Sequence, residues 1–192
     1  MKETVPSVKG SVFSSVVDDL KAALEAGRLA PEDLEAHLDA KDRGLMDSVV
    51  TAVSWVPVAA YGRMLELLAR VEGGKQREAY LRRRGARAAE RLLSGTYESF
   101  DAGPGKWGTR VGELMLGIAG ILYNFTRWSF SEVGPESWEI VVEEAQDLPD
   151  AAVHTAHGFL DWYLERSSNR RIRSSLSRPT PDRLVFRLSP KD

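Results

Sequence analysis

The sequence contains no cysteine. Disulfide bridges, thiolate zinc sites, iron–sulfur clusters and cysteine nucleophiles are therefore excluded together. A long hydrophobic run is missing too: the most apolar segment, Val111 to Phe125, contains Glu113. It is shorter than the roughly 20 apolar residues that cross a bilayer, and residues 1–6 offer no apolar stretch for a signal peptide. We therefore expect a cytoplasmic protein without a membrane span.

An excess of either charge is also lacking. The formal net charge is −2 over 192 residues, which gives no general attraction to nucleic acid or to anionic membranes. Aromatic residues that could stack on bases are not interleaved with the arginines, and this counts against single-stranded nucleic acid as a partner. The contents of hydrophobic residues (43%) and charged residues (28%) are typical of globular proteins. With no linker-like segment visible, we expect one α+β domain over residues 1–192.

The first two thirds of the chain carry hydrophobic residues at the spacing of helices. Proline and glycine mark the helix boundaries: Pro31 suits a first helical position, and Gly73-Gly74 suits a helix end. Residues 48–55 are compatible with either helix or loop. The expected helices cover residues 12–24, 31–38, 57–73, 75–93 and 111–125.

After residue 125 the hydrophobic period changes from 3.6 to 2. Residues 128–142 read as a hairpin with its turn at Gly134-Pro135, and residues 172–188 read as a second hairpin connected through residues 179–182. Between them, residues 150–164 show helical spacing. The expected fold is α+β, with N-terminal helices packed on one face of a C-terminal four-stranded antiparallel sheet, in the order helices, β-hairpin, helix, β-hairpin.

Residues for catalysis or metal binding are sparse. The chain has three histidines, and no serine stands in a Gly-x-Ser-x-Gly elbow. His154 and His157 lie three apart on an expected helix, but a metal site needs further ligands that the sequence does not show. We interpret His157 as a core residue with one satisfied nitrogen and His154 as a residue near the surface. The prediction is a protein that is not an enzyme, with no catalytic residue, metal or cofactor.

Arginines gather at two places. Arg84, Arg87 and Arg91 form a stripe on one expected helix, and Arg171 and Arg173 fall on the outward face of the last hairpin. We predict that these five residues bind a protein partner. The alternative is a solvated surface that is balanced by neighbouring acidic residues.

Large aromatic residues are scattered over elements that should converge between the helices and the sheet. Core packing explains such residues first, and the wall of a ligand pocket explains them second. If a small apolar ligand binds, we expect it near Trp55, Tyr61, Tyr123 and Trp128.

Several short motifs carry a resemblance to known families. Residues 8–13 (Val-Lys-Gly-Ser-Val-Phe), residues 54–58 (Ser-Trp-Val-Pro-Val) with Tyr61, and residues 85–87 (Gly-Ala-Arg) resemble a paralogous family of myxobacterial proteins of similar length. More distantly, the two hairpins and the intervening Gly158-Phe159-Leu160 helix resemble the 4-vinyl-reductase domain, whose fold group includes transport-particle subunits and haem-based nitric-oxide sensors. The resemblance implies an α+β fold with a cavity between helices and a twisted sheet, which in this fold group often holds a hydrophobic or tetrapyrrole ligand, and a tendency to form dimers.

The haem sensors of that fold group use a Tyr-x-Ser-x-Arg motif. Residues 97–101 keep Tyr97 and Ser99 but have Asp101 in place of the arginine. A haem held by this chain would take its axial nitrogen from His154 or His157.

Three hypotheses for function follow. The first is a non-catalytic regulatory domain that senses a small apolar ligand or docks a protein partner. The second is an adaptor that uses the arginine-rich face and has no ligand. The third is a haem- or metal-binding sensor. A homodimer is compatible with each of them.

Overall fold

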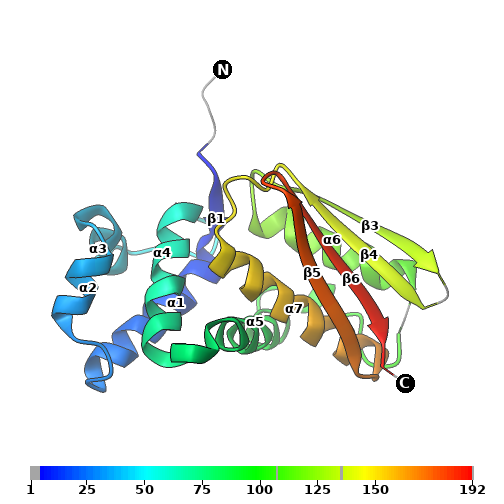
Figure 1. The fold of residues 1–192 in the computed structure, drawn as a ribbon, viewed down its shortest axis with the longest axis horizontal. Helices are drawn as coiled ribbons and strands as arrows, with labels where there is room; N and C mark the ends of the chain where they lie inside the picture. Colours follow the sequence, from blue (N-terminus) through cyan, green and yellow to red (C-terminus); the bar gives the residue numbers. More distant parts are fainter. Residues whose placement is uncertain (1–4, 107, 135, 192) are drawn as a thin grey trace.

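The computed structural model describes residues 5–106, 108–134 and 136–191. It confirms the α+β class, with helices preceding the two hairpins and one helix between them (Figure 1). The helices are α1 (Gly10–Glu25), α2 (Pro31–His37), α3 (Ala40–Asp47), α4 (Val58–Leu68), α5 (Arg77–Leu93), α6 (Thr109–Leu122) and α7 (Asp150–Ser168), with shorter turns η1 (Ala69–Gly73), η2 (Gly74–Gln76) and η3 (Glu98–Phe100). The strands are β1 (Ser7–Lys9), β2 (Trp55–Pro57), β3 (Arg127–Gly134), β4 (Ser137–Glu143), β5 (Ile172–Thr180) and β6 (Arg183–Pro190).

The predicted four-stranded antiparallel sheet is present, with the strand order β3-β4-β6-β5. The two hairpins join through their second strands, β4 and β6, where Ile140 pairs with Phe186. Both of these side chains are fully buried. Helix α6 packs against β3 and α7 against β5, while α1 to α4 lie beyond α7, away from the sheet (Figure 1). Pro135, placed by the sequence in the first hairpin turn, lies outside the described residues.

The structure adds elements that the sequence did not predict. Helix α3 has only two buried residues, so it shows little hydrophobic periodicity. Its start is fixed by Asp39, whose side chain accepts a hydrogen bond of 2.8 Å from the Asp42 amide. Strands β1 and β2 pair antiparallel over three residues each, too short a span for a period of two to be recognised. Of residues 48–55, for which the sequence allowed helix or loop, residues 48–54 form a loop and Trp55 begins β2.

Helices α5 and α7 approach each other with their backbones almost in contact. A Cβ atom on Gly85 would lie 1.9 Å from the Thr155 carbonyl oxygen, and a Cβ on Gly158 would lie 1.9 Å from the Arg82 carbonyl oxygen. Glycine is therefore required on both helices at this crossing. The two residues belong to the short motifs on which the family resemblance depends, and the structure supplies a physical reason for each.

We expect Gly85→Ala and Gly158→Ala each to lower the free energy of unfolding by about 2–4 kcal/mol, because the added methyl must push two rigid backbones apart. Urea unfolding followed by circular dichroism measures this. Gly120→Ala on α6 is the matched control: Gly120 is exposed, and its Cβ would meet no atom within 4 Å. That control should be neutral or stabilising by up to about 1 kcal/mol. Equal effects of the three substitutions would contradict the tight crossing.

Candidate functional site

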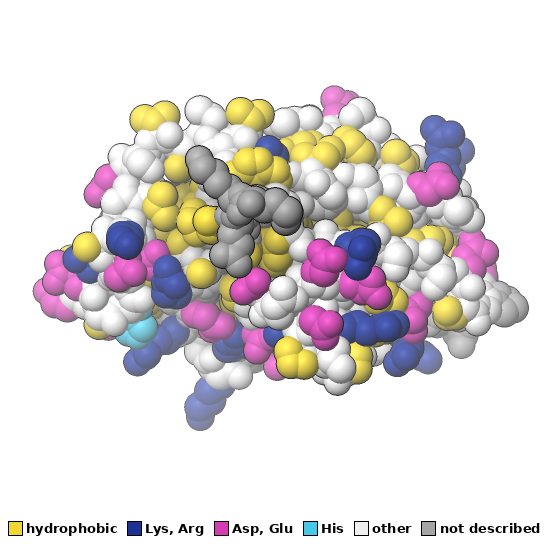
Figure 2. Space-filling model, turned by 90° about the horizontal axis from the view of Figure 1, so that it is seen from above, with side chains coloured by type: hydrophobic (Ala, Val, Ile, Leu, Met, Phe, Trp, Pro, Cys, Tyr) yellow, Lys and Arg dark blue, Asp and Glu magenta, His cyan; other side chains and the backbone are white. Residues whose placement is uncertain are grey.

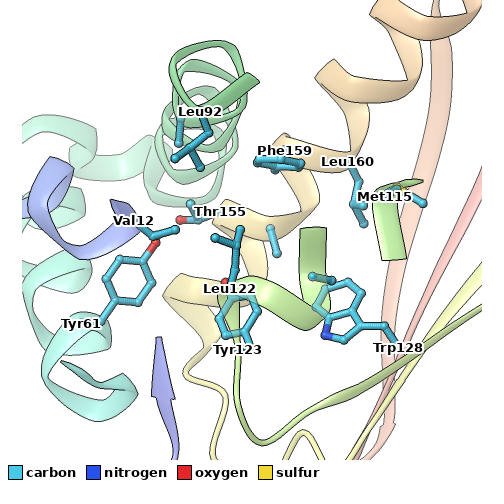
Figure 3. A pocket seen from close by; sticks show the side chains of 13 residues that line it. Val12, Tyr61, Leu92, Met115, Leu122, Tyr123, Trp128, Thr155, Phe159 and Leu160 are labelled. Atoms are coloured by element: carbon cyan, nitrogen blue, oxygen red, sulfur yellow. The ribbon is translucent and has the colours of Figure 1, made fainter. Parts of the chain in front are cut away.

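An apolar pocket lies where five helices meet the edge of the sheet (Figure 3). Its walls come from α1, α4, α5, α6 and α7, together with Tyr123, which follows α6, and Trp128 at the start of β3. We call it the apolar pocket. Its lining residues are Val12, Tyr61, Ala88, Leu92, Met115, Ala119, Leu122, Tyr123, Trp128, Thr155, Ala156, Phe159 and Leu160.

The sheet side of the apolar pocket is an aromatic stack. The rings of Tyr123 and Trp128 are stacked with centroids 6.2 Å apart, and Trp128 stacks in turn on Phe186 of β6 at 6.2 Å. The Trp128 indole N–H donates a 2.8 Å hydrogen bond to the Thr126 hydroxyl. Because its polar atom is satisfied outside the stack, Trp128 can present an apolar ring to the pocket.

The apolar pocket is small. The space open to the centres of water-sized molecules is about 50 Å³. One water needs roughly 10–15 Å³ on this measure, so the pocket as it stands accommodates a few non-hydrogen atoms. A larger ligand would have to displace side chains or extend through the mouth.

Two phenols supply the polar groups that face this apolar environment. The Tyr61 hydroxyl is buried and has no hydrogen-bond partner among the described residues. Burial raises the pKa of Tyr61, against the lowering effect of the nearby Arg84 charge. Burial likewise raises the pKa of Tyr123. Both side chains therefore stay neutral near pH 7 and can donate a hydrogen bond to a ligand.

Three of the four aromatic residues singled out in the sequence line the apolar pocket: Tyr61, Tyr123 and Trp128. Trp55 does not. It is 44% exposed on β2, where the alternation of the strand turns the neighbouring Val56 into the core instead. The ring of Trp55 lies under the Lys9 ammonium, 3.7 Å from its centroid.

The α7 wall was missed by the sequence reasoning. Thr155, Ala156 and Phe159 face the apolar pocket beside Leu160, and only the apolar spacing along α7 pointed to this face. A threonine and an alanine carry little hydrophobic signal, so their role depends on the close approach of α5 and cannot be read from residue type.

The predicted arginine face is divided by the fold. Arg84 is buried, with 2% of its surface exposed, whereas Arg87 and Arg91 are exposed on the same helix. Arg171 and Arg173 are exposed near the start of β5. On the face shown in Figure 2, basic and acidic side chains are interspersed. The outward sheet surface is balanced in the same way, since Arg187 pairs with Glu139 across β6 and β4 at 3.1 Å.

Neither His154 nor His157 lines the apolar pocket. His157 is 4% exposed, and its Nε2 atom lies 2.9 Å from the Ser174 hydroxyl on β5. This confirms the prediction of a core histidine with one satisfied nitrogen. Asp161 approaches the same Nε2 at 3.8 Å, so serine and carboxylate compete for one nitrogen instead of flanking the ring as a catalytic relay requires. Arg82 bonds to both Asp161 and Ser174, and the cluster ties α5 and α7 to the sheet.

Burial lowers the pKa of His157 from 6.5 to about 4, although Asp161 acts in the opposite direction. Burial also lowers the pKa of His154. A histidine held neutral in the folded state gives stability that is complete above its unfolded pKa and is lost as pH falls toward the folded value. We therefore expect the free energy of unfolding to fall by on the order of 2 kcal/mol from pH 7 to pH 4.5.

Urea unfolding at several pH values measures this effect. His157→Gln keeps a polar group near Ser174 but does not titrate, so it should flatten the dependence of stability on pH between 4.5 and 6.5. An unchanged slope in this variant would show that His157 is not the group responsible.

Comparison with known proteins defines the fold. No protein-family model and no curated protein matches this chain. Among solved structures, an iron(II) H-NOX protein without bound ligand, from K. algicida, matches with a TM-score of 0.63 at 12% identity, over 96% of this chain and 97% of that one. An H-NOX from T. tengcongensis matches with a TM-score of 0.62 at 13% identity, over 96% and 98%. Another matching structure concerns haem distortion in the H-NOX family. The chain therefore has a distant H-NOX-like fold, as the resemblance to haem-based nitric-oxide sensors indicated.

The apolar pocket does not fit a haem group. Its open space of about 50 Å³ is far below the roughly 300–1,000 Å³ of typical cofactor sites. Imidazole and thiolate, two common axial ligands, do not occur in the lining. Within the described ranges, no group of three or more histidine, aspartate or glutamate side chains is placed to hold a metal ion.

Adding haemin to the purified chain should therefore give the broad absorption of unbound haemin. A titration followed in the Soret region tests this, with haem-binding myoglobin as the positive control. A sharp Soret band that saturates at one haemin per chain would show that the pocket opens to admit the group.

Proposed function

We propose that residues 1–192 form one non-catalytic, regulatory domain that binds a small apolar molecule in the apolar pocket. The observation that carries the proposal is the pocket itself: a cavity lined by aliphatic and aromatic side chains, with few polar groups. Ligand sites have this composition, because apolar contact supplies affinity while a small number of polar groups fix orientation. The unpartnered Tyr61 hydroxyl is such a group.

The place of the pocket in the fold supports a regulatory role. Tyr61, Leu92, Trp128 and Phe159 bring four different elements to one cavity, so a ligand that occupies it contacts each of them. A ligand shifts a conformational equilibrium only through different affinities for the two states, and contacts to four separate elements of the fold give it the means. In the described part of the chain, no helix is long and apolar enough to cross a membrane.

A signal from such a domain needs a partner, and exposed arginines supply a second proposal. Arg87, Arg91, Arg171 and Arg173 are exposed and form no ion pair with any described residue. We propose that Arg171 and Arg173, close together at the start of β5, dock an acidic surface of another protein. Of the other arginines that the sequence predicted to bind a partner, Arg84 is buried, and Arg87 and Arg91 lie on a different element, α5.

The ligand proposal is tested with benzene as a minimal apolar probe. Saturating benzene should raise the thermal midpoint of the wild-type chain by about 2 °C or more, because a ligand that binds only the folded state stabilises it. Ala119→Leu places a larger side chain in the cavity and should abolish the shift.

Gly120→Ala, one position along α6 and directed to open space, is the matched control and should respond like the wild type. Differential scanning fluorimetry measures all three proteins. The absence of a shift in the wild type, or an equal shift in Ala119→Leu, contradicts binding in the apolar pocket.

A further inference from the structure

Arg84 is a cation buried between α1 and α5. Its Nη2 atom donates to the Ser15 hydroxyl at 3.1 Å and lies 2.9 Å from a carboxylate oxygen of Asp19. The side chain is only 2% exposed, while Asp19 is 36% exposed. Burying a guanidinium is costly unless its donors are paired, and this ion pair accounts for only one of its three nitrogen atoms.

The other two nitrogen atoms of Arg84 lack partners. Nε and Nη1 are both buried, and neither has a hydrogen-bond partner among the described residues. Buried donors are nearly always satisfied in native proteins, so each of these two atoms calls for an acceptor that the described residues do not supply. The Nε–H bond points away from Nη1, so one carboxylate can accept from only one of the two atoms.

Around Arg84 the surface forms a cleft, lined by Ser15, Asp19, Arg84, Arg87, Ala88 and Arg91. We call it the α1–α5 cleft. Three guanidinium groups face one carboxylate there. Arg87 and Arg91 are exposed and make no ion pair with any residue that the structure describes. The cleft therefore carries a local excess of positive charge in a chain whose net charge is slightly negative.

The cleft and the apolar pocket adjoin. Ala88 lines both of them, with Arg84 one turn earlier on α5 and Leu92 one turn later. The Arg84 charge also reaches Tyr61 of the pocket, where it opposes the burial effect on the phenol. A molecule that spans the Ala88 boundary would meet guanidinium groups at one end and apolar walls at the other.

We propose that the α1–α5 cleft binds the head group of the pocket's ligand, and that this ligand is a small amphipathic carboxylate. Its carboxylate accepts a hydrogen bond from the unpartnered Nη1 atom of Arg84, with Arg87 and Arg91 adding charge at the cleft. Its apolar tail enters the apolar pocket past Ala88. The inference depends on the proposed function, since it names the chemical class of ligand for the same pocket.

The test compares hexanoate with hexanamide, which has the same shape and no charge, by isothermal titration calorimetry on the full chain. The wild type should bind hexanoate at least about 10-fold more tightly, as expected for hydrogen bonds between charged groups. Affinity should also rise roughly fourfold per added methylene from butyrate to hexanoate, as the tail becomes buried.

Variants locate the head group. Arg84→Met should reduce the affinity for hexanoate to that for hexanamide. A substitution at the buried Arg84 can disturb folding, so the double variant Arg87→Gln/Arg91→Gln, at exposed positions, provides a second measurement. Its affinity for hexanoate should fall about 5-fold or more, while its affinity for hexanamide should stay unchanged. Arg83→Gln, an exposed arginine of α5 outside the cleft, is the matched control and should leave both affinities as they are.

Each outcome decides the matter. Hexanoate that binds no more tightly than hexanamide, or not at all, overturns the carboxylate assignment, as does a loss in Arg83→Gln as large as in the double variant. If benzene still stabilises the wild type in that case, the apolar pocket remains a ligand site, and only the assignment of a carboxylate head group to its ligand is wrong. If benzene fails too, the proposed function fails with it. Binding of inorganic phosphate as tight as that of hexanoate would show a bare anion site and would also overturn the inference.

Discussion

The backbone contact between α5 and α7 determines the geometry of the helical half of this protein. With glycine at positions 85 and 158, two helices pack so closely that a single methyl group on either would meet a carbonyl oxygen. This crossing fixes Thr155 and Phe159 on one side of the apolar pocket and Ala88 on the other. It also directs Arg84, one residue before Gly85, toward α1. Pocket, cleft and buried arginine thus follow from one steric requirement.

The sequence predicted the fold because its largest signals are periodic. Four strands with alternating hydrophobic residues and helices with regular apolar faces led to the observed order of elements and to the sheet. Short elements escaped prediction: β1 and β2 depend on pairing with each other, and α3 depends on a cap at Asp39. Local hydrogen bonds of this kind leave no hydrophobic pattern.

The site was harder to predict, since residue type does not say which way a side chain points. Tyr61, Tyr123 and Trp128 were found by their size, but Trp55, equally large, faces solvent because it alternates with Val56 on a strand. Arg84 looked like one member of an exposed stripe with Arg87 and Arg91. The stripe does exist on α5, yet α1 covers one end of it and leaves the other open. Burial imposed by a distant helix separates side chains of the same type into different roles.

The walls of the apolar pocket are drawn from positions as far apart in the chain as Val12 and Leu160. No short segment contains the site, so it comes into being only when both ends of the chain are in place. Binding and global folding are then one thermodynamic cycle, in which occupancy of the pocket opposes unfolding of the whole chain instead of rigidifying a loop. In a cell, the abundance of this protein would then rise with the concentration of the ligand that we propose, because the bound chain spends less time in the unfolded forms that proteases degrade.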